Sequence, residues 1–154
     1  KLPLEVARMR IRRARELGLD YKSYAGIRAS TGRDIVALLF SDNALRMLRD
    51  TGRIEAERAD KLAQVRAADL LALVHPPVTP AMALAANPDL LRVGSAPGLA
   101  HTWSDIRERI VDLKGATPAD GVLVVGETGF EREWSVAGRL AGFVPADRYF
   151  SAMV

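Results

Sequence analysis

Apolar and polar positions recur with two different periods along this chain, and together they predict both helices and buried strands. Over residues 3–17 apolar side chains return every three or four positions, which is the spacing of one helix face: Leu4, Ala7, Ile11 and Ala14. Residues 35–40 (IVALLF) and 122–125 (VLVV) are instead short, continuous apolar runs, typical of strands that are covered on both faces.

The same reasoning divides the rest of the chain. It predicts helices over about 21–29, 44–49, 54–75, 102–115 and 128–141, and brief strands at 91–93 and 148–150. The long helix over 54–75 rests on a stripe of small and apolar residues: Ala56, Ala59, Ala63, Ala67, Leu70 and Val74. Side-chain caps are expected at several helix starts: Asp20, Asp42 or Asn43, Thr102 with Asp105, and Thr128 with Glu131.

These elements predict a single α/β domain over residues 1–154. Its core is a small, mainly parallel sheet of three or four strands flanked by helices, with a basic helical pair at the N-terminus (residues 1–33). Residues 76–100 hold five of the eight prolines and are predicted to be the least regular section, a connector or lid with short helical turns after Thr79 and around Pro88.

Composition narrows the class of protein. Cysteine is absent, which excludes disulfides, thiolate metal ligands and a cysteine nucleophile, and it is consistent with a reducing compartment. No apolar run reaches the roughly 18 residues of a membrane span. We therefore expect a soluble cytoplasmic protein without a membrane partner, and we predict no metal site and no cofactor.

Charge is unevenly distributed. The net charge is +3, but residues 1–33 contain nine basic and three acidic residues, so the remainder is slightly negative. A positive end suits an acidic partner such as nucleic acid. Arg10 and Arg13 project into the apolar arc of the first helix, where each needs a carboxylate, phosphate or carbonyl partner.

Residues 14–27 match most of a helix-turn-helix pattern. Ala14 and Gly18 have the spacing of a close helix contact followed by a turn, and apolar residues follow where two helices would pack: Leu17, Leu19, Tyr24 and Ile27. We therefore predict a non-catalytic nucleic-acid-binding protein, with a regulatory role in transcription as one form of this function. The predicted nucleic-acid contacts are Arg8, Arg10, Arg12, Arg13, Arg15, Lys22 and Arg28.

A small enzyme or ligand sensor is the alternative. Two loops each follow a predicted strand and precede a helix, the place where open α/β sheets bind ligands. Their residues form the candidate ligand site: Ser41, Asp42, Asn43, Gly126, Glu127 and Thr128. Asp42 and Glu127 can serve as acid and base or hold a metal there, whereas the simpler interpretation makes Ser41, Asp42 and Thr128 ordinary helix caps.

A third interpretation is a protein-interaction module. Met9, the alanine-lined helix over 54–75 and the proline-rich connector offer a docking face for a partner helix or for a second copy in a homodimer. The remaining candidates give weak signals. His75 and His101 lack ligand-spaced partners, and Trp103 and Trp134 are expected to pack in the core or at an interface.

Overall fold

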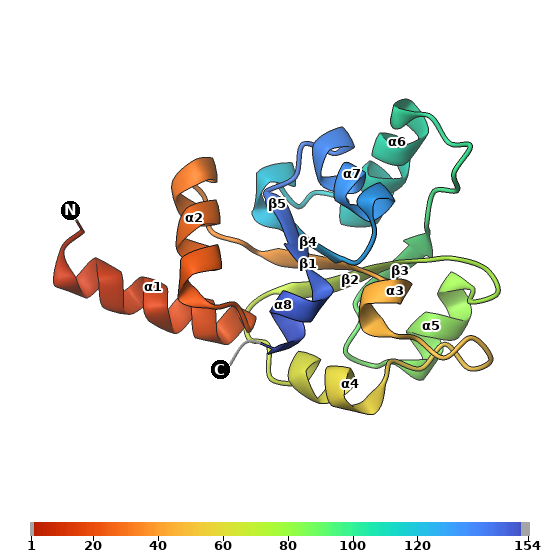
Figure 1. Ribbon diagram of the computed structural model, residues 1–154, viewed down its shortest axis with the longest axis horizontal. Helices are drawn as coiled ribbons and strands as arrows, with labels where there is room; N and C mark the ends of the chain where they lie inside the picture. Colours follow the sequence, from red (N-terminus) through yellow and green to blue (C-terminus); the bar gives the residue numbers. More distant parts are fainter. Residues whose placement is uncertain (1, 152–154) are drawn as a thin grey trace.

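Five parallel strands form the sheet at the centre of the molecule (Figure 1). The computed structural model describes residues 2–151. The spatial order is β3-β2-β1-β4-β5, and the strands are β1 (Ala37–Ser41), β2 (Asp69–Val74), β3 (Arg92–Ser95), β4 (Val122–Gly126) and β5 (Gly142–Pro145). The predicted α/β class and parallel sheet are confirmed, with five strands where three or four were expected.

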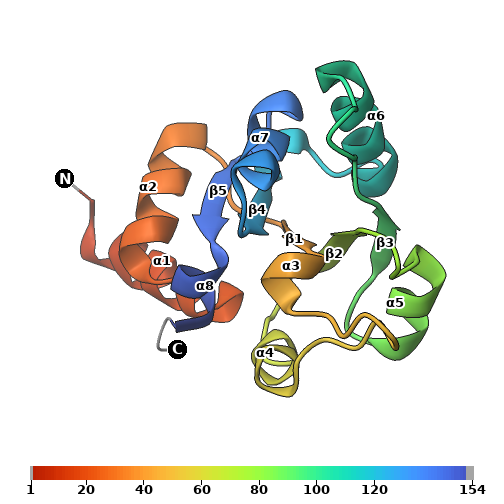
Figure 2. The same ribbon diagram turned by 45° about the vertical axis from the view of Figure 1, so that its right-hand side comes forward.

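Helices cover both faces of the sheet, which is why its strands are continuously apolar (Figures 1 and 2). Leu38 and Phe40 of β1 point to a face covered by α3 (Asp42–Leu45), α4 (Ala56–Leu62), α5 (Pro80–Ala86) and α8 (Ala146–Ser151). Ala37 and Leu39 point to the opposite face, which is covered by α6 (Trp103–Lys114) and α7 (Gly129–Ala137). A short 3-10 turn, η1 (Ala119–Gly121), precedes β4.

The two N-terminal helices lie at one end of the molecule (Figure 1). These are α1 (Leu4–Leu17) and α2 (Tyr21–Thr31), joined by a turn in which Gly18 has a φ of 78° and Asp20 caps α2 by accepting from the Ser23 amide. Ala14, Leu17, Leu19 and Tyr24 are buried, and Ile27 is half-buried, as the helix-turn-helix spacing predicted.

The predicted core stripe of α1 is only partly correct. Its C-terminal end is buried at Ala14, but Leu4 and Ile11 are 65% and 45% exposed. The first half of α1 extends past the sheet (Figure 1), so the rest of the described chain covers these side chains only in part. The half-buried side of α1 is instead the one carrying Val6, Ala7 and Arg10.

The predicted helix over 54–75 and the strand at 148–150 are wrong. Helix α4 ends at Leu62, Ala67 adopts a φ of 55°, and the chain then enters β2, so the alanine-lined docking face does not form. The alanine spacing suits a helix, but Leu70 to Val74 is another continuous apolar run and pairs in the middle of the sheet. Residues 148–150 belong to α8, and the last strand lies earlier, at β5.

Capping follows the prediction at some helices and departs from it at others. Thr102 and Asp105 form the predicted reciprocal capping box on α6. Helix α3 is a single turn capped by Ser41, as the simpler interpretation of this loop predicts, and not by Asp42 or Asn43. Thr128 caps α7 by accepting from the Glu131 amide, but the Glu131 side chain turns elsewhere. Within residues 2–151, none of the helices combines the length and apolar character needed to cross a bilayer.

Candidate functional site

The carboxyl ends of β1 and β4 meet at the topological switch point of the sheet, where the order in which the chain adds strands reverses. From β1 the chain adds β2 and β3 on one side, and it then crosses to add β4 and β5 on the other. The connections that leave β1 and β4 therefore diverge onto opposite faces, and open α/β sheets bind ligands in the crevice between them. The predicted convergence of the two loops is confirmed, because Ala37–Phe40 pairs in parallel with Val122–Val125.

A buried carboxylate joins the two loops. Glu131 is 1% exposed, and its Oε1 accepts from the Ser41 hydroxyl at 2.5 Å and from the Glu127 amide at 2.7 Å. Its Oε2 accepts from the Asn43 side-chain amide at 2.7 Å. A buried carboxylate must have its oxygens occupied to be tolerated, and these donors from both loops satisfy that need. Glu131 is therefore a positioning residue that fixes the loop after β1 against the loop after β4.

A histidine and an aspartate form a pair beside this carboxylate. The Oδ1 atom of Asp42 lies 2.7 Å from Nδ1 of His75, and Oδ2 accepts from the His75 backbone amide at 3.1 Å. Asp42 follows β1 and His75 follows β2, so the sheet brings together residues 33 positions apart. These two contacts to Asp42, one from the ring and one from the backbone of His75, hold the imidazole in its orientation. With Nδ1 bonded to the carboxylate, Nε2 is the nitrogen left to meet a ligand.

The surroundings favour the charged imidazolium. The hydrogen bond to Asp42 raises the pKa of His75 above 6.5, partial burial opposes the rise, and the charges of Asp42 and Glu131 add to it. A histidine whose pKa is raised by an orienting carboxylate is suited to proton transfer near neutral pH.

A cavity of about 270 Å³ opens beside the pair. Its polar wall includes His75, Asn43 and Thr128, and its apolar wall includes Leu99, Trp103, Phe130 and Trp134. The ring centroids of His75 and Trp134 are 6.4 Å apart. The volume lies just below the roughly 300–1,000 Å³ found for ligand sites, so the cavity suits a small molecule.

The predicted ligand-site residues have different places around this cavity. Asn43 and Thr128 line it, and Asp42 acts on it through His75. Ser41 is fully buried and caps α3, while Gly126 supports the wall behind it, since a Cβ on Gly126 would lie 2.8 Å from Phe143 and 3.0 Å from Glu131. The Glu127 side chain is not part of the lining. Within residues 2–151 no group of three or more potential ligands for a metal ion is found.

Sequence reasoning missed His75, because a helix was predicted to end there. The cause was the alanine spacing over residues 54–67, which hid the apolar strand that follows. One feature of the sequence does identify His75. It comes directly after the apolar run Leu70–Val74, just as polar residues come after the apolar runs at 35–40 and 122–125. The second histidine, His101, also lines the cavity, but its ring nitrogens already contact Gly98 and Arg109.

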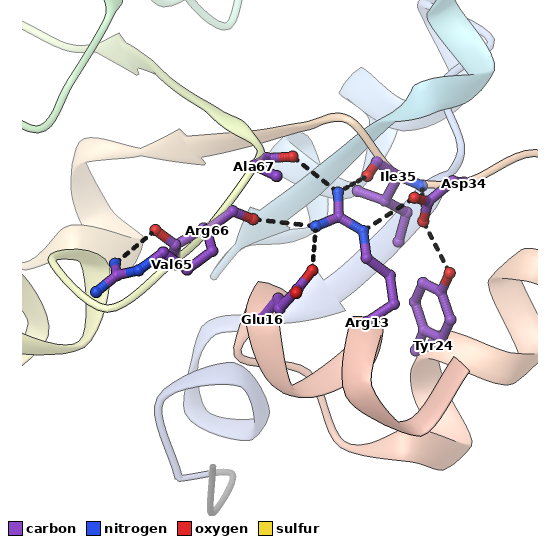
Figure 3. Close-up of polar contacts among 8 residues, drawn as sticks. All are labelled: Arg13, Glu16, Tyr24, Asp34, Ile35, Val65, Arg66 and Ala67. Atoms are coloured by element: carbon purple, nitrogen blue, oxygen red, sulfur yellow. Dashed lines mark hydrogen bonds and ion pairs between the residues drawn. The ribbon is translucent and has the colours of Figure 1, made fainter. Parts of the chain in front are cut away.

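Arg13 has an intramolecular role (Figure 3). Its Nε donates to Asp34 at 2.9 Å, and the Nη1 and Nη2 groups donate to Glu16 and to three backbone carbonyls, those of Ile35, Arg66 and Ala67. All five N–H groups are thus occupied, and none is left for a phosphate. The partner that the sequence required for Arg13 is therefore supplied by the chain itself, and Arg13 ties α1 to the segments that lead into β1 and β2.

The other predicted nucleic-acid contacts are distributed around α1 and α2. Arg8, Arg12 and Arg15 are exposed on α1, and Lys22 is exposed on α2. Arg8 lies 3.8 Å from Glu5, and both side chains are open to solvent, so the pair contributes little. Arg10, Arg12 and Arg28 line a cavity of about 350 Å³ between the two helices. Among residues 2–151, no ion pair is found for Arg10, Arg12, Arg15, Lys22 or Arg28.

Comparison of the chain with protein-family models, with curated proteins and with solved structures found no match in any of the three. The geometry of the sites themselves is therefore the basis for assigning a function.

Proposed function

We propose that this protein binds a small, largely apolar molecule in the cavity at the carboxyl edge of the sheet and exchanges a proton with it through His75. The observation that carries the proposal is the His75–Asp42 pair at the sheet's switch point, in which His75 lines the cavity and Asp42 holds its ring. The proposal is the ligand-site alternative derived from the sequence, with His75 in place of Glu127 as the proton-exchanging group.

The chemistry follows from the state of the imidazole ring. When His75 is neutral, Nδ1–H donates to Asp42, and the lone pair on Nε2 can accept a proton from a bound molecule or from a water beside it. When His75 is charged, Nε2–H can donate to an oxygen or nitrogen of the ligand. Asp42 stabilises the charged form and holds the ring, while Glu131 keeps the two loops together.

The two tryptophans of the chain make this proposal testable without a known ligand. Both Trp103 and Trp134 line the cavity, so their indole N–H signals in an NMR spectrum report on this site alone. A library of small aromatic alcohols, acids and amines is the probe. We expect at least one compound to shift both indole signals saturably, and His75→Gln to weaken its binding roughly tenfold or more, because a hydrogen bond to a charged group is lost.

Two further variants separate binding from folding. His101→Gln changes the other histidine of the cavity wall, whose nitrogens are already engaged, and we expect it to weaken binding less than His75→Gln. Asp42→Asn retains the imidazole but removes the carboxylate, so the pH at which affinity changes should move down. The proposal fails if no compound shifts the indole signals, or if His75→Gln remains folded and binds as well as the unmodified protein.

Nucleic-acid binding is the second candidate function, and one observation favours it. Arg8, Arg12 and Arg15 are exposed on a helix that projects beyond the sheet (Figure 1). Such a helix can reach phosphates without rearrangement of the fold. Replacing all three by alanine should weaken binding to duplex or single-stranded nucleic acid and reduce the slope of log K against log salt by about 0.9 for each duplex phosphate that is no longer neutralised. Unchanged affinity and slope would remove this candidate.

A further inference from the structure

A third cavity, separate from the carboxyl edge, lies between α1 and the end of α4. It has a volume of about 290 Å³. Its lining is strongly basic and consists of Arg12, Arg15, Glu16, Gly18, Lys61, Gln64, Val65 and Arg66. Sequence reasoning did not single out Lys61 or Arg66, because both lie in the region mistaken for one long helix.

The charges in this lining do not cancel. Four basic side chains stand against one carboxylate, and that carboxylate, Glu16, is also bonded to Arg13 at 3.1 Å. The C-termini of α1 and α4 lie here as well, and each adds about half a negative charge. Roughly two positive charges remain, concentrated around a hollow and not spread over a flat surface, so the cavity attracts an anion.

The walls of the cavity are fixed before any ligand arrives. The Arg66 amide donates to the Glu16 carbonyl at 2.9 Å, which joins the loop after α4 to α1. Arg13 bonds the carbonyls of Arg66 and Ala67 from the other side (Figure 3). One Arg66 nitrogen donates to Ala63 and Val65, which leaves its remaining donors available. A preorganised wall lowers the entropic cost of binding.

Lys61 adds a half-buried amine to this wall. Its ammonium group donates to the Tyr149 carbonyl and lies 4.1 Å from the centroid of the Tyr149 ring. Burial lowers the pKa of Lys61 from 10.5 to about 8, and the charge of Asp20 opposes this shift. No carboxylate lies within ion-pair distance of Lys61 in the described chain, so a bound anion would be its charge partner.

We infer that this cavity binds a tetrahedral oxyanion of the phosphate class, held by Arg12, Arg15 and Arg66 at its rim and by Lys61 in its wall. Arginine side chains bind such groups through paired N–H donors, and the volume leaves room for one phosphate group and its hydration. The phosphate can belong to a nucleic-acid backbone or to a small phosphorylated molecule. The site shares no lining residue with the cavity beside His75, so this inference does not depend on the proposed function.

Sulfate is the probe, because it has the shape of phosphate and no proton to exchange near pH 8. Saturable sulfate binding, measured by calorimetry at pH 8, should be accompanied by proton uptake, since the anion restores the charge of Lys61. Arg12→Gln with Arg15→Gln should weaken binding roughly tenfold or more. Lys61→Met should weaken binding and abolish the proton uptake. Arg49→Gln with Arg53→Gln also removes two positive charges, at exposed positions outside the cavity, and it should change neither the affinity nor the proton uptake.

A competition experiment then identifies the source of the phosphate. If a short oligothymidylate displaces sulfate, the site receives backbone phosphates, and if only small phosphate esters displace it, the ligand is a phosphorylated metabolite. Both outcomes support the inference. Absence of saturable sulfate binding would overturn it, as would equal weakening in the Arg49→Gln, Arg53→Gln control and in the folded Arg12→Gln, Arg15→Gln variant, because binding would then depend on net charge alone.

Discussion

Replacement of Arg13 by alanine tests the most connected polar group in the N-terminal region. The Arg13 side chain is 14% exposed and makes five hydrogen bonds, two to carboxylates and three to backbone carbonyls. Alanine would leave Asp34 with only its bonds from Tyr24 and the Ile35 amide, and it would leave three carbonyls near the start of β1 and β2 without this donor. We therefore expect a loss of stability, not merely a loss of surface charge.

The size of the loss follows from burial. Breaking a fully buried ion pair costs about 3–5 kcal/mol. The carboxylates of Asp34 and Glu16 are 41% and 37% exposed, so water can partly replace the guanidinium. A reduced loss of about 2–3 kcal/mol remains, which for a chain of this length corresponds to a fall in Tm of roughly 5–10 °C. Arg13→Lys keeps the charge but has three donors where five are needed, so it should lose about half as much.

Urea unfolding followed by tryptophan fluorescence measures the difference, since Trp134 is buried in the core. Arg12→Ala is the matched control. It removes the same side chain from the neighbouring, exposed position, and it should change the free energy of unfolding by no more than about 0.5 kcal/mol. If the Arg13 and Arg12 variants unfold at the same urea concentration, the assignment of Arg13 to the interior framework is refuted.

Because the pKa of His75 is raised in the folded protein, the contribution of this residue to stability is complete below pH 6.5 and is lost as the pH rises through the pKa of the folded state. Asp42→Asn should shift the NMR titration of the imidazole to lower pH, and an unshifted titration would contradict the pairing of Asp42 with His75. Ser41→Ala removes a buried hydroxyl that donates to Glu131 and caps α3, so calorimetry should record a loss of about 1–3 kcal/mol, whereas an unchanged Tm would mean that the loop is held by other contacts. Gly18→Ala should destabilise the protein by more than about 1 kcal/mol, because the φ of Gly18 is 78° and a Cβ would lie 2.8 Å from the Tyr149 hydroxyl. Gly26→Ala, at a helical position with open space around it, should instead stabilise the protein by up to about 1 kcal/mol. Equal changes in Tm for the two variants would contradict the turn geometry.

The pattern of apolar and capping residues predicted a helix or strand correctly where the residues of that element alone determine its structure. The runs at 35–40 and 122–125 predicted buried parallel strands, and the Thr102–Asp105 capping box predicted the start of α6. The pattern failed at residues 54–75, where alanine spacing favours a helix by itself but pairing with β1 and β3 makes Leu70–Val74 a central strand. It failed again on α1, because periodicity identifies an apolar side but not whether anything covers it.

By itself, the sequence determined the α/β class, the parallel sheet, the turn at Gly18 and the need of Arg13 for a partner, because each depends on neighbours along the chain or on the cost of burying a charge. Only the tertiary structure decided which residues far apart in the sequence contact one another. The order of the strands placed Asp42 beside His75 and Glu131 beside Ser41, and it placed the end of α4 against α1. Contacts between residues far apart in sequence depend on how whole elements pack, and this packing has no local pattern from which it can be read.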